Sequence, residues 1–462
     1  MQRTTIPFGP DAVDLTLDDG VDILSMPSPD PVGDPAAAVE RALDSPIAAR
    51  PLDELIRSAL ARKSDAVAAI VISDHTRPVP YKGDQGILWP IISRLQRGGF
   101  SADRIEVLVG TGTHQPLTDA QLKGMLDARV FSSGVRVINH DSRDPATLQR
   151  LGRTRRGSDV LMNRRYLAAD LKILTGLVES HFIAGASGGR KAVCPGLIGE
   201  ETTYVFHSAR MMADPGSRDL NLDGNPTHEE SLEVARMAGV DFIVNVTLDK
   251  AFRLTGVFAG DLEQAHLAAF RRLREYVAIP VKGEYDVILT HAGFVGINHY
   301  QSVKACLAAL PALRKDGYLT LVAANTDTDP IGSLKYRAVL HLLKLIGPER
   351  LRKLIFSPDW TFVPEQWEVQ AWARIFERIP ESHFVYYSPW MPEKDYRVFP
   401  GVDGNIHLPA NKRWQPETGG MQAVLDGSLA AARKELAGRG VTSPAVAFLS
   451  DGPYGILDPR LG

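Results

Sequence analysis

Polar and ionisable residues follow several short apolar runs of this sequence, at the point where each run ends. Asp74 and Arg77 follow the first of these runs, His114 follows the second and His181 follows the third. Histidine exchanges protons near neutral pH, and arginine can hold a carboxylate or phosphate through two parallel hydrogen bonds. These positions make His114 and His181 candidate catalytic residues, and they make Arg77, together with Lys304, a candidate ligand for an anion.

A glycine-rich segment, HFIAGASGGRKAVCPG, begins at His181. Gly185, Gly188 and Gly189 lie close enough to let the backbone approach a phosphate, although a tight turn without a ligand explains them equally well. The segment is not a P-loop, because the fifth residue after Gly185 is Arg190 where that motif needs glycine. The run GTGTHQ likewise lacks the third glycine of the dinucleotide fingerprint. A nucleoside triphosphatase and a nicotinamide dehydrogenase are therefore disfavoured, and a mononucleotide phosphate held by this segment stays open.

Three further histidines have less distinctive surroundings. His207, within YVFHSAR, has the local pattern of a buried helix histidine. His140 and His291 both lie at the ends of apolar runs, and the sequence favours neither a structural nor a functional role for them.

The elements that must position these residues follow from the alternation of apolar runs and helix-like segments. The runs are short and rich in Val and Ile, as strands buried on both faces are. Such alternation predicts parallel sheets covered by helices, which place ligands beyond the carboxyl ends of their strands. The predicted strands are residues 66–73, 104–109, 135–138, 171–177, 240–246, 285–289, 318–323, 383–387 and 445–449. The predicted helices include residues 87–97, 229–237, 262–276 and 302–313.

We predict an α/β fold with two domains, each with a largely parallel sheet covered by helices, and an active site in the cleft between them. The segment IPVKGE separates a long helix from a fresh strand, so the expected domains are residues 1–279 and 280–462. The last helix and strand, within residues 416–462, could belong to either domain.

Length and composition limit the class of protein. The chain has 462 residues, 52 basic and 55 acidic, with a net charge of −3 and 44% hydrophobic residues. This balance excludes a disordered chain and a strongly basic nucleic-acid binder. No apolar run is long enough to span a bilayer, and the N-terminus lacks the apolar core of a secretory signal. The only cysteines, Cys194 and Cys306, exclude a disulfide framework, so we expect a cytoplasmic protein.

Four motifs, in their order and spacing, resemble those of the lactate racemase family that uses a nickel-pincer nucleotide. They are SDHTRPVP, GTGTHQP, ESHFIAGASGGRKAVCPG and HYQSVK, and the resemblance spans roughly residues 65–390. The resemblance implies that His114 and His181 are the catalytic pair. It also implies that Lys191, ten residues after His181, forms the covalent link to the cofactor, and that His207, sixteen residues further on, completes the nickel coordination.

The same resemblance implies further contacts to cofactor and substrate. It places Asp74, Arg77, Gly188 and Gly189 at the cofactor, and Arg77, Tyr300, Gln301, Lys304 and Trp367 at the substrate. Phe182, Ile183, His299 and Trp360 are further candidates for the residues that select the substrate. Dedicated cofactor-synthesis proteins would be needed for maturation.

The implied reaction inverts C2 of a 2-hydroxy acid. Removing the C2 hydrogen as a proton would place carbanion charge beside the carboxylate, whereas removing it as hydride, as the hydroxyl proton leaves, gives a 2-keto acid. A nickel-bearing pyridinium can hold the hydride and return it to either face. One histidine per face must then exchange the hydroxyl proton, which explains a pair, and a neutral imidazole such as that of His207 suits nickel.

Three alternatives stay open from the sequence. The enzyme could be an epimerase of a longer sugar acid or a diacid within the same family, and His299 beside Tyr300 is a weak hint of it. His114, His181 and His207 could instead surround zinc in a hydrolase. The chain could also be a non-catalytic carrier of the nickel nucleotide.

Overall fold

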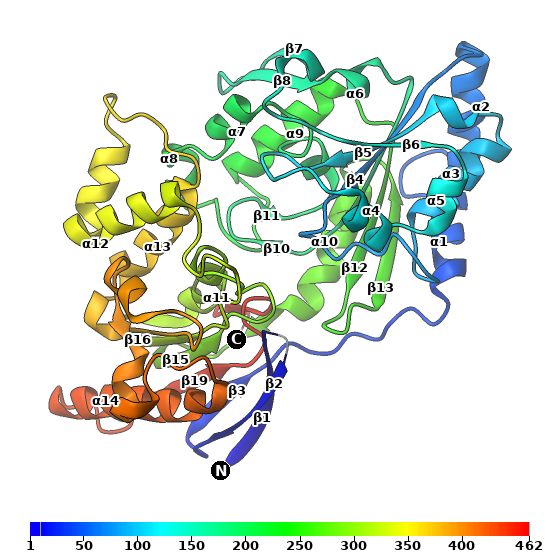
Figure 1. Ribbon diagram of the computed structural model, residues 1–462. Coiled ribbons are helices and arrows are strands. Elements are labelled where there is room, and N and C mark those ends of the chain that lie inside the picture. The colour runs from blue at the N-terminus through cyan, green and yellow to red at the C-terminus, as the bar shows by residue number, and fades with distance from the viewer. Residues whose placement is uncertain (10, 462) are drawn as a thin grey trace. The chain divides into compact units, whose positions relative to one another are not determined.

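The structure is a computed structural model that describes residues 1–9 and 11–461, and the chain forms two compact units (Figure 1). Residues 28–275 form one unit, here called the middle unit. Residues 1–27 and 276–462 form the other, here called the terminal unit. The predicted α/β class is confirmed, because a six-stranded sheet flanked by helices lies in each unit.

The sheet of the middle unit has the strand order β13-β12-β9-β4-β5-β6. All neighbouring strands are parallel except the edge strand β13, which is antiparallel to β12. The strands are β4 (Ala68–Ser73), β5 (Ile105–Gly110), β6 (Arg136–Asn139), β9 (Leu171–Leu177), β12 (Phe242–Leu248) and β13 (Leu254–Gly260), with a separate hairpin of β7 (Leu148–Arg153) and β8 (Asp159–Asn163). The helices are α1 (Pro35–Asp44), α2 (Leu52–Arg62), α3 (Leu88–Arg97), α4 (Asp119–Met125), α5 (Ala128–Ser132), α6 (Arg164–Ala168), α7 (Glu200–Phe206), α8 (Ala209–Ala213), α9 (Pro226–Ala238) and α10 (Gln264–Val277).

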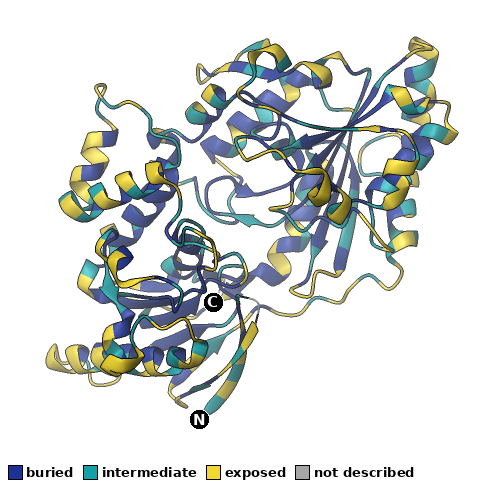
Figure 2. Cartoon of the chain, viewed as in Figure 1, coloured by how far each residue is buried: buried dark blue, intermediate teal, exposed yellow. Residues whose placement is uncertain are grey.

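Strand β4 shows why these strands are continuously apolar. Successive side chains of a strand point to opposite faces. Ile70 and Ile72 belong to a buried cluster that includes the apolar faces of α1, α2 and α3. Val71 belongs to a second cluster, with residues of α9 and α10. Both faces are therefore covered, and the strands are dark blue in Figure 2.

The terminal unit contains a fully parallel sheet with the order β18-β17-β16-β15-β19-β3. Its strands are β3 (Val21–Leu24), β15 (Tyr285–His291), β16 (Leu313–Val322), β17 (Phe384–Tyr387), β18 (Val402–Asp403) and β19 (Val446–Leu449). Smaller pairs are β1 (Gln2–Phe8) with β2 (Asp11–Leu17), and β14 (Ala278–Pro280) with β20 (Ile456–Asp458). The helices are α11 (His299–Ala309), α12 (Leu334–Ile355), α13 (Gln366–Arg378) and α14 (Met421–Gly438).

The domain division differs from the expected 1–279 and 280–462 at the N-terminus. Residues 1–27 belong to the terminal unit, because β3 pairs with β19 and the β1–β2 hairpin buries Ile6 and Phe8 in a cluster with Phe448. The observed change of unit between Glu275 and Tyr276 lies close to the predicted boundary. The C-terminal helix and strand, whose place was open, belong to the terminal unit as α14 and β19.

Within residues 1–9 and 11–461, no helix is both long enough and apolar enough to cross a bilayer.

Candidate functional site

The carboxyl ends of three adjacent strands position the polar residues that the sequence singles out in the middle unit. Asp74 follows β4 directly, His114 lies in the turn after β5, and His181 lies in the short strand β10 (Ser180–His181) after β9. The strands are neighbours in the order β9-β4-β5 and are parallel, so their carboxyl ends lie at one edge of the sheet. The sequence prediction that these residues gather at one edge is confirmed.

A short hydrogen bond joins His114 to Asp74. The distance from His114 Nδ1 to Asp74 Oδ2 is 2.6 Å, and Asp74 is buried whereas His114 is exposed. Burial raises the pKa of Asp74, but the hydrogen bond and charge of His114, with help from Thr76 and Arg77, outweigh it and lower the pKa overall. Asp74 therefore stays ionised and accepts the Nδ1 proton, which leaves Nε2 of His114 to exchange a proton.

Arg77 forms an ion pair with Glu179, a residue that the sequence reasoning did not single out as functional. The distance from Arg77 Nε to Glu179 Oε1 is 2.9 Å, and both side chains are about one-third exposed. Glu179 immediately precedes the Ser180–His181 strand, so the pair connects the loop after β4 to the start of the glycine-rich segment.

The glycine-rich segment forms a compact turn that requires glycine. Strand β11 (Gly185–Ala186) pairs with β10, and a 3-10 turn spans Gly189–Ala192. Gly188 and Gly189 have φ values of 74° and 50°, and a Cβ on Gly189 would lie 2.9 Å from the His266 ring. The amide of Gly189 donates to Asn245 Oδ1 at 3.0 Å. Packing and backbone conformation thus explain why Gly188 and Gly189 are glycines. Their role in cofactor binding stays a prediction.

Substituting Gly188 should destabilise the fold. At φ 74° and ψ −176°, a non-glycine residue is strained, and its Cβ would lie 2.7 Å from Val178 Cγ2. We expect Gly188→Ala to lower the free energy of unfolding by about 1–3 kcal/mol, measured by urea denaturation. Gly124→Ala in α4 is the matched control, because its Cβ would meet nothing within 4 Å and should cost no stability. Equal stabilities of the two variants would contradict this explanation.

Lys191 lies beside His181 at the end of this segment. The distance from Lys191 Nζ to His181 Nε2 is 2.8 Å. The backbone amides of Ile183 and Ala184 both donate to Nδ1 of the same ring at 3.2 Å. These backbone contacts orient the ring, and Nε2 is the nitrogen that faces the lysine.

His207 is buried at the C-terminal end of α7, as its local sequence predicted. Its Nδ1 lies 3.1 Å from the carbonyl oxygen of Thr203, so Nδ1–H donates and Nε2 carries the lone pair. Burial, followed by the charges of Lys191 and His114, lowers the pKa of His207 to about 3. His207 is therefore a neutral imidazole within electrostatic range of Lys191 and His114.

The terminal unit contains four of the five residues that the resemblance places at the substrate, and the fifth, Arg77, belongs to the middle unit. Tyr300, Gln301 and Lys304 lie on α11, where Lys304 Nζ donates to Gln301 Oε1. Trp367 is the second residue of α13, and its Nε1 donates to Tyr300 Oη at 2.8 Å. Tyr300 and Lys304 are four residues apart and share one face of α11.

His299 does not have the position that its neighbour Tyr300 led us to expect. It is fully buried in an aromatic cluster, with ring centroids 4.4 Å from Trp372 and 4.3 Å from Phe399. Its Nδ1 lies 2.8 Å from Tyr336 Oη. His299 therefore packs the interior of the terminal unit, and it gives no support to a substrate with extra polar groups.

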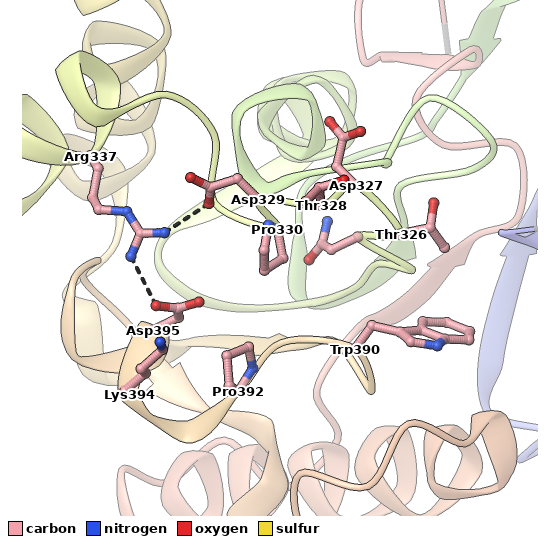
Figure 3. A pocket seen from close by; sticks show the side chains of 11 residues that line it. Thr326, Asp327, Thr328, Asp329, Pro330, Arg337, Trp390, Pro392, Lys394 and Asp395 are labelled. Carbon is pink, nitrogen blue, oxygen red and sulfur yellow. Dashed lines mark hydrogen bonds and ion pairs between the residues drawn. The ribbon is translucent and has the colours of Figure 1, made fainter.

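A cavity of about 700 Å³ opens in the terminal unit beyond the carboxyl ends of β16 and β17 (Figure 3). Arg337 of α12 reaches across one side of it and binds Asp329 at 2.7 Å and Asp395 at 2.9 Å. None of the residues that the sequence singled out as functional lines this cavity. The lining residues are Asn325, Thr326, Asp327, Thr328, Asp329, Pro330, Arg337, Trp390, Pro392, Lys394 and Asp395.

Comparisons with known proteins decide the family. Residues 8–219 match the family model described as the lactate racemase N-terminal domain. A lactate racemase of Lactiplantibacillus plantarum is 34% identical over 372 residues, covering 80% of this chain and 82% of that protein. The chain belongs to the lactate racemase family. A second lactate racemase, of Thermoanaerobacterium thermosaccharolyticum, is 32% identical over 340 residues, covering 73% of this chain and 76% of that protein. Membership makes the chain an enzyme, an isomerase of the racemase type.

Solved structures confirm the fold of this lactate racemase family member. The lactate racemase apoprotein from T. thermosaccharolyticum matches with a TM-score of 0.82 and 24% identity, covering 99% of this chain and all of that chain. A protein from Thermotoga maritima matches with a TM-score of 0.56 and 16% identity, covering 78% of this chain and 94% of that chain.

The zinc-hydrolase alternative finds no support in the geometry. Across the described residues, 1–9 and 11–461, no three His, Cys, Asp or Glu side chains are grouped so that they could hold a metal ion. His114 pairs with Asp74, His181 faces Lys191, and His207 bonds to the carbonyl oxygen of Thr203, so each of the three histidines has a different partner.

A buried glutamate, Glu368, is a second residue near the racemase motifs that the sequence reasoning missed. It directly follows Trp367 and is 3% exposed. Adjacency to Trp367 was the available signal, but a sequence does not reveal that a glutamate is buried.

Proposed function

We propose that this racemase inverts C2 of a 2-hydroxy acid through a 2-keto acid, using a nickel-pincer nucleotide. The observation that best supports the proposal is that different groups orient the imidazole rings of its two histidines. His114 is oriented by the ionised carboxylate of Asp74, and His181 is oriented by two backbone amides of the glycine-rich segment. Two independently oriented imidazoles are what proton exchange on two faces of one carbon requires.

The residues of the middle unit suit the proposed cofactor. His207 offers a neutral ring nitrogen, a donor that suits nickel, and the hydrogen bond from Nδ1–H to the carbonyl oxygen of Thr203 fixes its orientation. Lys191 Nζ lies 2.8 Å from His181 Nε2, so the amine proposed to form the link lies beside a histidine of the proposed catalytic pair. We propose that Lys191 carries the covalent link and that Asp74, Arg77, Gly188 and Gly189 line the nucleotide. When bound, the nickel-bearing pyridinium supplies the acceptor for the C2 hydride.

The chain's own residues then handle the proton and the carboxylate. We propose that His114 Nε2 takes the hydroxyl proton of one enantiomer and that His181 takes that of the other. Each histidine returns the proton to the keto oxygen when the reaction runs in the opposite direction. Arg77 and Lys304 are the cations proposed to hold the carboxylate. Gln301 orients Lys304, and the pair of Trp367 with Tyr300 shapes the substrate side.

The proposed substrate class is a small 2-hydroxy acid. Both curated relatives carry the name lactate racemase, which favours lactate as the first compound to test. The hint of a longer sugar acid or diacid loses its basis, because His299 is enclosed by aromatic rings.

The decisive experiment is production of the protein together with the cofactor-synthesis proteins that the proposal requires for maturation. We expect an intact-mass increase of nucleotide size, one nickel per chain, and racemisation of at least one acid in a chiral chromatography panel of lactate, malate and sugar acids. Cofactor binding without loss of C2 stereochemistry in any acid would favour the carrier alternative. Absence of both nickel and nucleotide would refute the proposal.

A further inference from the structure

Glu368 is a buried carboxyl group beside the residues proposed to bind the substrate. It lies in the first turn of α13, directly after Trp367, which donates to Tyr300 Oη. No hydrogen-bond partner for Glu368 Oε2 lies within the described residues, 1–9 and 11–461. A buried, unpartnered carboxylate oxygen is costly, so the surroundings of Glu368 must control its charge.

The charged and titratable groups that face Glu368 come from three elements. Lys304 and Tyr300 of α11 contribute a cation and a phenol. Glu365, the residue that precedes α13, contributes a second carboxylate, which accepts a hydrogen bond from Ser333 Oγ. Tyr336 of α12 contributes another phenol.

These surroundings favour the neutral acid. Burial raises the pKa of Glu368 to about 8, because the repulsion by Glu365 adds to the cost of burial and the attraction of Lys304 offsets only part of it. Glu368 is thus protonated at neutral pH, and it becomes an anion next to Lys304 only in alkaline solution.

We propose that Glu368 is a positioning residue: as a neutral acid it leaves the Lys304 ammonium to the carboxylate of the substrate, and as an anion it draws that ammonium into an ion pair. The inference rests on the proposed function in that Lys304 binds the substrate carboxylate. An ionised Glu368 competes with the substrate carboxylate for the Lys304 ammonium, which weakens substrate binding and leaves the two catalytic histidines unaltered. The pH dependence should therefore be a property of KM more than of kcat.

The charge of Glu368 can be measured without the cofactor. In the full chain as isolated, infrared spectroscopy should show the carbonyl band of a protonated carboxyl at pH 7, and the band should disappear with a midpoint near pH 8. Glu368→Gln should remove this band. Glu377→Gln, an exposed position on the same helix, should leave it unchanged. A wild-type spectrum without the band, or a band that persists in Glu368→Gln, would overturn the inference.

The kinetic consequence is tested in the cofactor-loaded enzyme. One ionisation near pH 8 should raise KM for the 2-hydroxy acid about tenfold between pH 7 and pH 9. The rise should be absent in Glu368→Gln, whose amide mimics the neutral acid, and it should be retained in Glu377→Gln. A rise that survives in Glu368→Gln would overturn the inference by assigning it to another group, such as Lys304 itself.

The two measurements separate the inference from the proposed function. A protein that shows the Glu368 band but racemises none of the acids tested would refute the proposed function, and with it the assignment of Lys304 to a substrate carboxylate. A protein that racemises an acid but lacks the band would refute only the role of Glu368.

Discussion

Replacing His114 with alanine should lower kcat for the interconversion of enantiomers by about 10²- to 10⁴-fold, the usual contribution of a general acid–base residue. His181→Ala should have a loss of the same order, because racemisation in either direction needs one histidine to accept the proton and the other to return it. The two variants should differ in a single turnover. Each should still convert one enantiomer to the keto acid, and the enantiomer that reacts should be opposite in the two variants. Rapid quenching followed by detection of the keto acid measures this difference.

The control for this experiment is His341→Ala, an exposed histidine of α12. It should leave both the overall rate and the single-turnover pattern unchanged. If either single variant kept the wild-type rate, or if both reacted with the same enantiomer, the assignment of one histidine to each face would be wrong.

Removing His207 should abolish nickel binding. His207→Ala deletes the neutral nitrogen donor from a buried position. Removing a group that only supports a metal ligand costs up to about 100-fold in activity, so removing the ligand itself should cost at least about 100-fold. The intact-mass increase should persist in this variant, because the proposed covalent link is at Lys191. Lys191→Ala should lose the covalent link to the cofactor, so the denatured protein should show no mass increase.

Metal analysis and denaturing mass spectrometry distinguish these two losses. His407→Ala in the terminal unit and Lys123→Ala on α4 serve as controls and should retain both the nickel and the mass increase. Stoichiometric nickel in His207→Ala would contradict its assignment as the metal ligand. An unchanged mass increase in Lys191→Ala would show that another residue forms the link.

The sheets could be predicted from the sequence because burial on both faces makes parallel strands continuously apolar. Each of the nine apolar runs contains or overlaps a strand, and β9 matches its predicted bounds in full. The edge strand β13 was not predicted, because its residues, LTGVFAG, are interrupted by glycine and polar side chains. The placement of residues 1–27 could not be predicted either, since the pairing of β3 with β19 joins segments more than 400 residues apart in the chain.

The candidate site was predictable where residues follow strands. Asp74, His114 and His181 gather because their strands are parallel neighbours, a consequence of topology that local sequence can indicate. Glu368 and His299 illustrate the limit. Both are polar residues beside expected substrate residues, and only their tertiary surroundings show that one faces Lys304 and the other is enclosed by aromatic rings.

The joining of β3 to β19 has a consequence for the order of events during synthesis. The middle unit is complete once Glu275 has left the ribosome, whereas the edge strand β3, made among the first residues, must wait for residues 446–449. At a synthesis rate of about 5–20 residues per second, the time from the synthesis of Glu275 to that of Leu449 is roughly 10–35 s. During it, the strand edge that β19 will cover is open to pairing with other chains. Premature termination near residue 440 should therefore yield a chain with a folded middle unit and an aggregation-prone remainder.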